Sequence, residues 1–432
     1  MASNSLFKTR SGVNYFLPFV LVTLCFALWG FANDITNPMV KAFSKIFRMS
    51  VADGALVQLA FYGGYFAMAL PAALFIRKFS YKSGIVMGLG LYALGALLFI
   101  PAGQIGLYYP FLIAYFIMTC GLSFLETSAN PYILSMGESS QATRRLNLAQ
   151  AFNPIGSLLG MFVAMEFIQS RLNPLSSSER ATLTNVEFEL IKNSDLNVLV
   201  RPYMFLGIVI LVIFLCFLLV KMPSGESAAQ GVSSLKHTFG RLFHNTAYRE
   251  GVVAQFFYVG AQIMCWTFII QYGTKVFMSE GMREIDAEVL SQRYNILAMM
   301  LFCVSRFVCT FLMKYVKPNK LLSFFALAAG LLTLGVIFVG GRFGLYSLVA
   351  ISVCMSLMFP TIYGLSLSGV GDDAKVGAAG LIMAILGGSV LPPLQAAIID
   401  LEGILGLQSV NVSFILPLIC FVIIAVYGIR NK

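Results

Sequence analysis

Long apolar runs recur along the whole chain and are separated by short polar segments. Each run is close to or above the roughly 20 residues that cross a bilayer as a helix. A helix satisfies its own backbone hydrogen bonds in lipid, and the runs lack the alternation of barrel strands, so they predict transmembrane helices. We predict twelve spans, at residues 14–42, 51–76, 83–102, 107–135, 146–170, 202–221, 249–277, 288–314, 321–340, 344–367, 376–400 and 409–429.

The composition supports this pattern. Of 432 residues, 58% are hydrophobic and 11% are charged, whereas soluble domains carry roughly 25% charged residues. We therefore predict an all-α integral membrane protein embedded in the lipid bilayer. Lys8 and Arg10 precede the first apolar run as they would in a signal sequence. That run is too long for a signal-peptide core and lacks a clear small-residue cleavage site, so we interpret it as the first span.

The distribution of the 29 Lys and Arg residues predicts the topology. With the N-terminus inside, the segments predicted to be cytoplasmic hold most of them, while a short outer loop such as PAGQIG (101–106) holds none. The positive-inside rule then places both termini in the cytoplasm of a multi-pass protein, which we expect in a bacterial inner membrane. Topology thus explains the net charge of +10, and no basic stripe suggests a nucleic-acid partner.

Several kinds of chemistry find no support in the residue types. All eight cysteines fall inside predicted spans without a CxxC pair, and His237 and His244 lie in the polar central loop. This pattern favours apolar core cysteines over disulfides or metal ligands. The chain also lacks a GxxxxGK[ST] stretch that would cradle a nucleotide phosphate. We predict that the protein is not an enzyme, holds no metal and needs no cofactor.

The connection at 221–250 separates six spans from six. We predict three parts, an N-terminal six-helix bundle at 1–220, a cytoplasmic linker at 221–248 and a C-terminal six-helix bundle at 249–432. The halves carry a faint repeat, in which 75–99 resembles 311–338 and 124–138 resembles 359–373. Two duplicated halves with a binding site at their interface form a plan typical of transporters.

Polar residues at helical spacing locate the faces that point away from lipid. Such residues recur in spans one, two, four, five and seven, at Trp29, Asn33, Asn37, Gln58, Tyr62, Tyr65, Thr119, Ser123, Glu126, Thr127, Asn130, Gln150, Asn153, Gln262 and Trp266. For a single Ser or Thr, interhelical hydrogen bonding is the simpler interpretation. It does not account for so many amides, nor for two tryptophans about midway along their spans, since membrane Trp usually lies near the lipid headgroups.

Neutral amides, hydroxyls and flat aromatic faces suit an uncharged, polyhydroxylated solute. An anionic solute would require several inward cations, and only Arg306 qualifies, with pairing to carbonyls or a carboxylate as an equal alternative. A lipophilic cation would also fit a cavity with one carboxylate. The amides favour a sugar.

The energy for uptake has to come from an ion gradient. A carboxyl group sheltered from water can bind a proton on one side of the membrane and release it on the other. Glu126 and Asp34 are the acidic residues deepest in predicted spans, so both are candidates for proton coupling.

Eight stretches together carry a resemblance that covers nearly the whole chain. They are FALWGFAN (26–33), FYGGYF (61–66), RKFSYKSGI (77–85), LYALGALLF (91–99), GLSFLETSANPY (121–132), RLNLAQAFN (145–153), QFFYVGAQIMCW (255–266) and FPTIY (359–363). On these residues the chain resembles the L-fucose permeases, which are sugar:proton symporters of the major facilitator superfamily.

The resemblance implies two six-helix bundles around a central cavity that opens alternately to either side. It implies that Glu126 binds the coupling proton, that Gln150 and Asn153 contact the sugar, and that Trp29 and Trp266 line the cavity. Asn33, Asn37, Asn130 and Gln262 complete the predicted substrate-binding set.

One position departs from the family pattern. Fucose permeases carry an acidic residue where this chain has Asn37, in ITN (35–37), while Asp34 lies one helical turn earlier. Asp34 either replaces that acid or pairs with another helix. L-Fucose is therefore the first-choice substrate, with glucose, galactose or another hexose as the alternative. The remaining hypotheses are a lipophilic-solute exporter and a membrane enzyme or sensor, and we expect a monomer.

Overall fold

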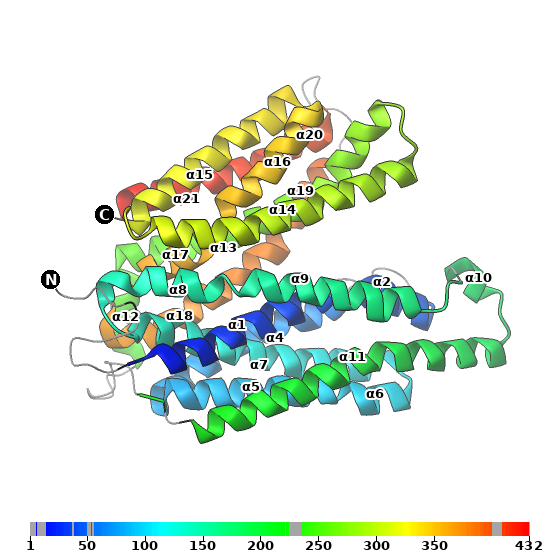
Figure 1. Cartoon of the computed structure of the whole chain (residues 1–432), viewed down its shortest axis with the longest axis horizontal. Helices are drawn as coiled ribbons and strands as arrows, with labels where there is room; N and C mark the ends of the chain where they lie inside the picture. Colours follow the sequence, from blue (N-terminus) through cyan, green and yellow to red (C-terminus); the bar gives the residue numbers. More distant parts are fainter. Residues whose placement is uncertain are drawn as a thin grey trace. The chain divides into compact units, whose positions relative to one another are not determined.

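The computed structural model describes residues 6, 14–36, 39–49, 53, 56–175, 177–220, 222–223, 235–399 and 408–431. Twelve helices in this part of the chain are long and apolar enough to cross a membrane, which confirms the predicted helical membrane fold. Figure 1 colours the helices in chain order, from blue near the N-terminus to red near the C-terminus.

Six spans come from the first half of the chain. They are formed by α1 (Phe16–Thr36), α4 (Leu56–Lys78), α5 (Tyr81–Leu97) with α6 (Phe99–Ile105), α7 (Tyr108–Ser135), α8 (Ala142–Gln150) with α9 (Asn153–Val163), and α11 (Asn185–Leu219). The shorter helices α2 (Met39–Phe47) and α10 (Ser177–Ala181) lie in the connections.

The second half contributes the other six spans. They are α13 (Thr246–Ser279), α14 (Glu284–Leu312), α15 (Pro318–Leu334), α16 (Gly341–Met355) with α17 (Met358–Ser366), α18 (Ala374–Met383) with α19 (Gly387–Ile399), and α20 (Ser409–Ser413) with α21 (Ile415–Arg430). Helix α12 (Leu235–His244) precedes them. Short 3₁₀ or π turns η1 to η6 lie at Ser139–Gln141, Ala164–Ile168, Gln169–Arg171, Gly335–Val339, Gly371–Asp373 and Ala384–Leu386.

Residue contacts divide the chain into two compact units. One, here the first-half unit, comprises Val13–Met136 and Phe152–Ala228. The other, here the second-half unit, comprises Met1–Gly12, Gly137–Ala151 and Ala229–Lys432. Helix α8 therefore belongs to the second-half unit, although its sequence lies in the first six spans.

The apolar run predicted as span six, from residue 202, lies in a longer helix. Helix α11 begins at Asn185, because a capping box starts it there: Thr184 N donates to Glu187 Oε2 at 3.1 Å, and Glu187 N donates to Thr184 Oγ1 at 3.4 Å. The first turns of this helix are polar, so hydropathy does not detect them. The first span is also shorter than predicted, since α1 ends at Thr36 and α2 follows as a separate helix.

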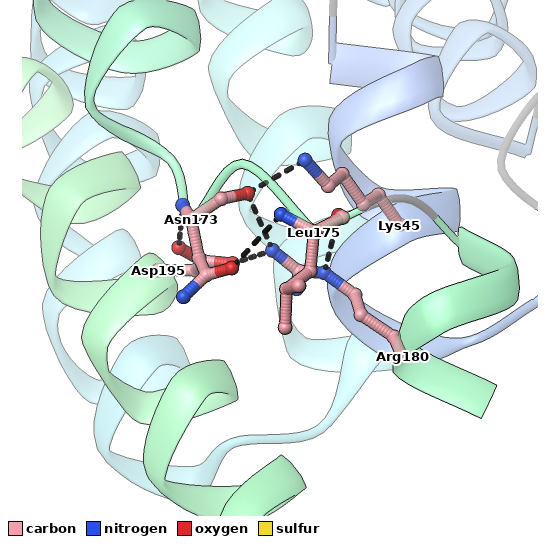
Figure 2. Close-up of polar contacts among 5 residues, drawn as sticks. All are labelled: Lys45, Asn173, Leu175, Arg180 and Asp195. Carbon is pink, nitrogen blue, oxygen red and sulfur yellow. Dashed lines mark hydrogen bonds and ion pairs between the residues drawn. The ribbon is translucent and has the colours of Figure 1, made fainter. Parts of the chain in front are cut away.

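A buried ion pair organises the segment between spans five and six. Arg180 of α10 donates to Asp195 Oδ2 of α11 at 2.6 Å, and the two side chains are 0% and 1% exposed. Asp195 Oδ1 accepts from the backbone N of Asn173 at 2.8 Å, and Arg180 also donates to the carbonyl oxygens of Asn173 and Leu175. Lys45 of α2 donates to the same Asn173 carbonyl at 2.6 Å (Figure 2). Removal from water, and then the charge of Arg180, lower the pKa of the Lys45 ammonium group.

Glycines bring pairs of helices into backbone contact in both halves. A Cβ on Gly156 of α9 would lie 1.8 Å from the carbonyl oxygen of Ala27 in α1. A Cβ on Gly387 of α19 would lie 2.0 Å from the carbonyl oxygen of Phe256 in α13. Spans one and five thus repeat the contact of spans seven and eleven, as a duplication of six helices predicts.

The Arg180–Asp195 pair provides a test of stability. Asp195→Ala leaves the Arg180 charge buried without its carboxylate, so we expect a loss of about 3–5 kcal/mol in the free energy of unfolding. Thermal unfolding in detergent measures this loss. The control is Glu189→Ala, which breaks the exposed 2.7 Å pair with Lys192 on the same helix and is expected to cost less than about 1 kcal/mol. Equal effects of the two variants would contradict a special contribution of the buried pair.

Candidate functional site

Glu126 lies in the most enclosed part of α7. Every residue from Met118 to Ile133 is buried, and Glu126 itself is 2% exposed. Among the described residues, neither of its carboxylate oxygens has a hydrogen-bond partner, and no Lys or Arg forms an ion pair with it. An ionised carboxylate in such surroundings costs several kcal/mol. The structure thus places an uncompensated acid inside the first-half unit.

The hydroxyl of Tyr65 in α4 is the polar group that interacts with Glu126. The two side chains are close enough for an electrostatic interaction, yet neither forms a hydrogen bond of normal geometry within the described residues. Ser123 Oγ donates to the Tyr65 carbonyl oxygen at 3.1 Å, which ties α7 to α4 at this level. The polar atoms around the carboxyl group therefore leave it open to a proton.

Other members of the α7 stripe bond to backbone. Asn130 Nδ2 donates to the Glu126 carbonyl oxygen at 3.0 Å, and Thr119 Oγ1 donates to the Tyr115 carbonyl oxygen at 3.0 Å. Both side chains are fully buried. These bonds stay within α7 and occupy a polar atom of each side chain, which leaves Glu126 as the chemically distinct residue of the stripe.

Helices α1 and α9 carry the next group of predicted residues. Trp29 and Asn33 are half-buried in α1, and Asp34 beside them is buried with polar interactions of its own. Asn153, at the start of α9, donates from Nδ2 to the Phe26 carbonyl oxygen at 3.2 Å and so bridges the two helices. Asn37 lies outside the described residues. The first-half unit thus gathers Trp29, Asn33, Asp34 and Asn153 on two packed helices.

The tenth span is broken in the middle of the second-half unit. Helix α16 ends at Met355 and α17 begins at Met358. Side chains from neighbouring helices donate to carbonyl oxygens at this break. Tyr258 Oη donates to Met355 O at 3.1 Å, and Ser305 Oγ donates at 2.9 Å to Val353 O, which also accepts from the backbone N of Ser356. Non-helical backbone at membrane depth requires such partners.

Trp266 and Gln262 lie one turn apart on α13 and are both half-buried. Trp266 Nε1 donates to Ser352 Oγ of α16 at 3.2 Å, and its ring packs against Phe302 with centroids 5.0 Å apart. A half-buried indole beside a broken helix leaves aromatic surface for a ligand. The second-half unit therefore holds Gln150, Gln262 and Trp266, while the other described candidates lie in the first-half unit.

Arg306 of α14 is bound by carbonyl oxygens. Its Nε donates to Ser356 O at 2.5 Å and its Nη1 donates to Gln150 O at 2.9 Å. Of the two roles that the sequence allows for this residue, ligand binding and pairing with carbonyls, the structure shows the carbonyl contacts. The signal that could have identified them is proline, because Pro154 and Pro360 each lie four residues after one of the two acceptors.

Within the described residues, no three His, Cys, Asp or Glu side chains gather as a metal site requires. The first-half unit offers a buried acid, amides and the indole of Trp29, and the second-half unit offers amides and the indole of Trp266. Residues of these types can bind a proton and can form hydrogen bonds with a polar solute.

Comparison with known proteins identifies a family and two similar transporters. Residues 22–393 match the family model of the Major Facilitator Superfamily. An L-fucose-proton symporter of Haemophilus influenzae is 51% identical, over 96% of this chain and 96% of its own. A glucose/galactose transporter of Brucella abortus is 31% identical, over 98% of this chain and 96% of its own.

Among solved structures, the chain is similar to the Major Facilitator Superfamily transporter FucP in its outward conformation. The TM-score is 0.87, the sequence identity is 33%, and the match covers 97% of this chain and 99% of that chain. Twelve membrane-spanning helices, a family match over most of the sequence and full-length relatives agree. The chain therefore belongs to the Major Facilitator Superfamily.

Proposed function

We propose that this protein is a symporter that takes up a neutral monosaccharide together with protons by alternating access, and that L-fucose is its substrate. The observation that carries this proposal is the Glu126 carboxyl group, buried in α7 without a hydrogen-bond partner or cation among the described residues. A proton removes the charge that makes this position costly. Glu126 is thus suited to carry a proton through the membrane.

The choice of sugar rests on two supports. Half-buried amides and indoles at Asn33, Asn153, Gln262, Trp29 and Trp266 match a solute with alternating hydroxyl and C–H surfaces. The relative that is 51% identical is named for L-fucose. Glucose or galactose is the second candidate, favoured by the 31% identical transporter named for those sugars.

We also propose roles for the remaining predicted residues. Asn37, Asn130 and Gln150 complete the sugar-binding set, and Asp34 is the second acidic residue of the coupling mechanism, which assists Glu126 without being indispensable. The excess of Lys and Arg in alternate connections supports cytoplasmic termini in a bacterial inner membrane. The coupling ion is the proton, no cofactor takes part, and the monomer is the working form.

Uptake into proteoliposomes tests the function. A proton moving inward at 100 mV contributes about 2.3 kcal/mol, so one proton per sugar concentrates the solute roughly fifty-fold. We expect labelled L-fucose to accumulate under an inward proton gradient and to equilibrate when a protonophore is added. Equal accumulation of L-fucose with and without the proton gradient would refute symport. Accumulation of D-glucose or D-galactose, but not of L-fucose, would establish the second candidate.

Glu126→Gln tests the coupling site. The amide keeps the size of the side chain but cannot exchange a proton, so we expect accumulation to fall from roughly fifty-fold to equality across the membrane. Exchange of labelled for unlabelled L-fucose is expected to continue, because it needs no net proton movement. Tyr65→Phe serves as the matched variant that retains the acid. Normal accumulation by Glu126→Gln would remove this residue from the mechanism.

Asp34→Asn separates the two acidic residues. Asp34 has polar interactions of its own, whereas Glu126 has no hydrogen-bond partner among the described residues. We therefore expect Asp34→Asn to slow uptake severalfold while still building a sugar gradient. The ratio of internal to external L-fucose at steady state is the decisive measurement. Complete equilibration by this variant would show that both carboxyl groups are needed.

A further inference from the structure

Two prolines release two backbone carbonyls inside the second-half unit. Pro154 and Pro360 lie in the first turns of α9 and α17, where a missing N–H is tolerated. Each proline deprives the carbonyl four residues earlier of its helical donor, and these carbonyls belong to Gln150 and Ser356. The breaks after α8 and α16 fall at these positions.

One guanidinium group binds both released carbonyls. Arg306 donates to Ser356 O at 2.5 Å and to Gln150 O at 2.9 Å, and its guanidinium lies over the Phe302 ring at 4.6 Å from the centroid. The side chain is 3% exposed, and no carboxylate among the described residues forms an ion pair with it. Such a fork of donors in fixed directions is available only from arginine. We call Arg306 with these two carbonyls the arginine clasp.

The clasp acts on a helix that connects the two units. Helix α8 packs in the second-half unit, where Asn147 Nδ2 donates to Thr361 Oγ1 of α17 at 3.2 Å and Arg144 Nε donates to Thr310 O of α14 at 3.3 Å. Helix α9, which continues the same span, packs in the first-half unit. The chain therefore passes from one unit to the other at residues 151–152, directly after the clasped Gln150.

We propose that Arg306 is a positioning residue of the transport cycle: the arginine clasp holds α8 against α14 and α17 in this conformation, and releases Gln150 when the protein changes access. This inference rests on the proposed alternating-access function. Release leaves a guanidinium and a carbonyl that both need new hydrogen bonds, and water supplies them when an aqueous path reaches α8. The clasp thus makes the departure of α8 depend on the entry of water.

Arg306→Gln tests the clasp in the full-length protein. In proteoliposomes we expect the maximal rate of L-fucose exchange to change at least tenfold, with KM within threefold of the wild-type value. Equilibrium binding of labelled L-fucose is expected to change less than threefold. This separation of rate from affinity identifies a residue that positions helices.

Cys309 reports on the clasp without any sugar. Its thiol is fully buried, with Sγ 3.8 Å from Ser356 Oγ. We expect Arg306→Gln to raise the rate of Cys309 alkylation by N-ethylmaleimide at least fivefold, as measured by peptide mass spectrometry. Pro154→Ala is the second variant, because a restored N–H competes for the Gln150 carbonyl. We expect Pro154→Ala to change the rates of exchange and of Cys309 alkylation in the same direction as Arg306→Gln does, but by a smaller factor.

The matched control is Arg144→Gln, the same substitution at a half-buried arginine of the same helix contact. For Arg144→Gln we expect the rates of exchange and alkylation to stay within twofold of the wild-type values. We expect Arg306→Lys to restore only part of the wild-type behaviour, because a single ammonium group lacks the fork of donors. Loss of L-fucose binding in folded Arg306→Gln would make Arg306 a sugar ligand and overturn the proposal. So would normal exchange, or an equal effect of Arg144→Gln. If the wild type exchanges no sugar, the proposed function has failed, and unchanged Cys309 alkylation in Arg306→Gln then overturns the clasp independently.

Discussion

Backbone hydrogen bonding in a lipid environment is the constraint on which this structure depends. A regular helix meets it internally, which is why twelve long helices account for the membrane spans. The breaks after α8 and α16 are exceptions, since prolines there leave carbonyl oxygens without helical donors. Arg306 donates to both proline-released carbonyls, and Tyr258 and Ser305 donate to Met355 O and Val353 O beside the second break. Irregular backbone therefore survives in the interior because side chains from α13 and α14 satisfy it.

Removal from water also makes charge expensive, and three buried charged sites differ in how they are compensated. Arg180 and Asp195 form a pair with each other and with backbone groups. Arg306 is bound by two backbone carbonyls. Glu126 has neither kind of partner among the described residues. This contrast supports the proposal that Glu126 exchanges a proton, because protonation removes its charge.

Much of the polar stripe serves helix packing. Asn153 bridges α9 to α1, and Ser123 bridges α7 to α4, each by donating to a backbone carbonyl. Glycines such as Gly156 let the helices approach closely enough for these bonds to form. An amide that bonds to backbone through its nitrogen still has an oxygen to offer a hydroxyl. Packing and sugar recognition are therefore compatible at Asn153.

The sequence by itself determined the number of spans, the depth of Glu126 and the family, since bilayer thickness sets the length of apolar runs and the motifs are local. It did not predict the start of α11, whose first turns are polar and are held by a capping box and an ion pair to α10. Only the tertiary structure decided the partners of Arg306, which lie 50 and 156 positions away in the chain. The residue type sets how many hydrogen bonds a side chain can form, but the choice of partner depends on which distant helices pack together.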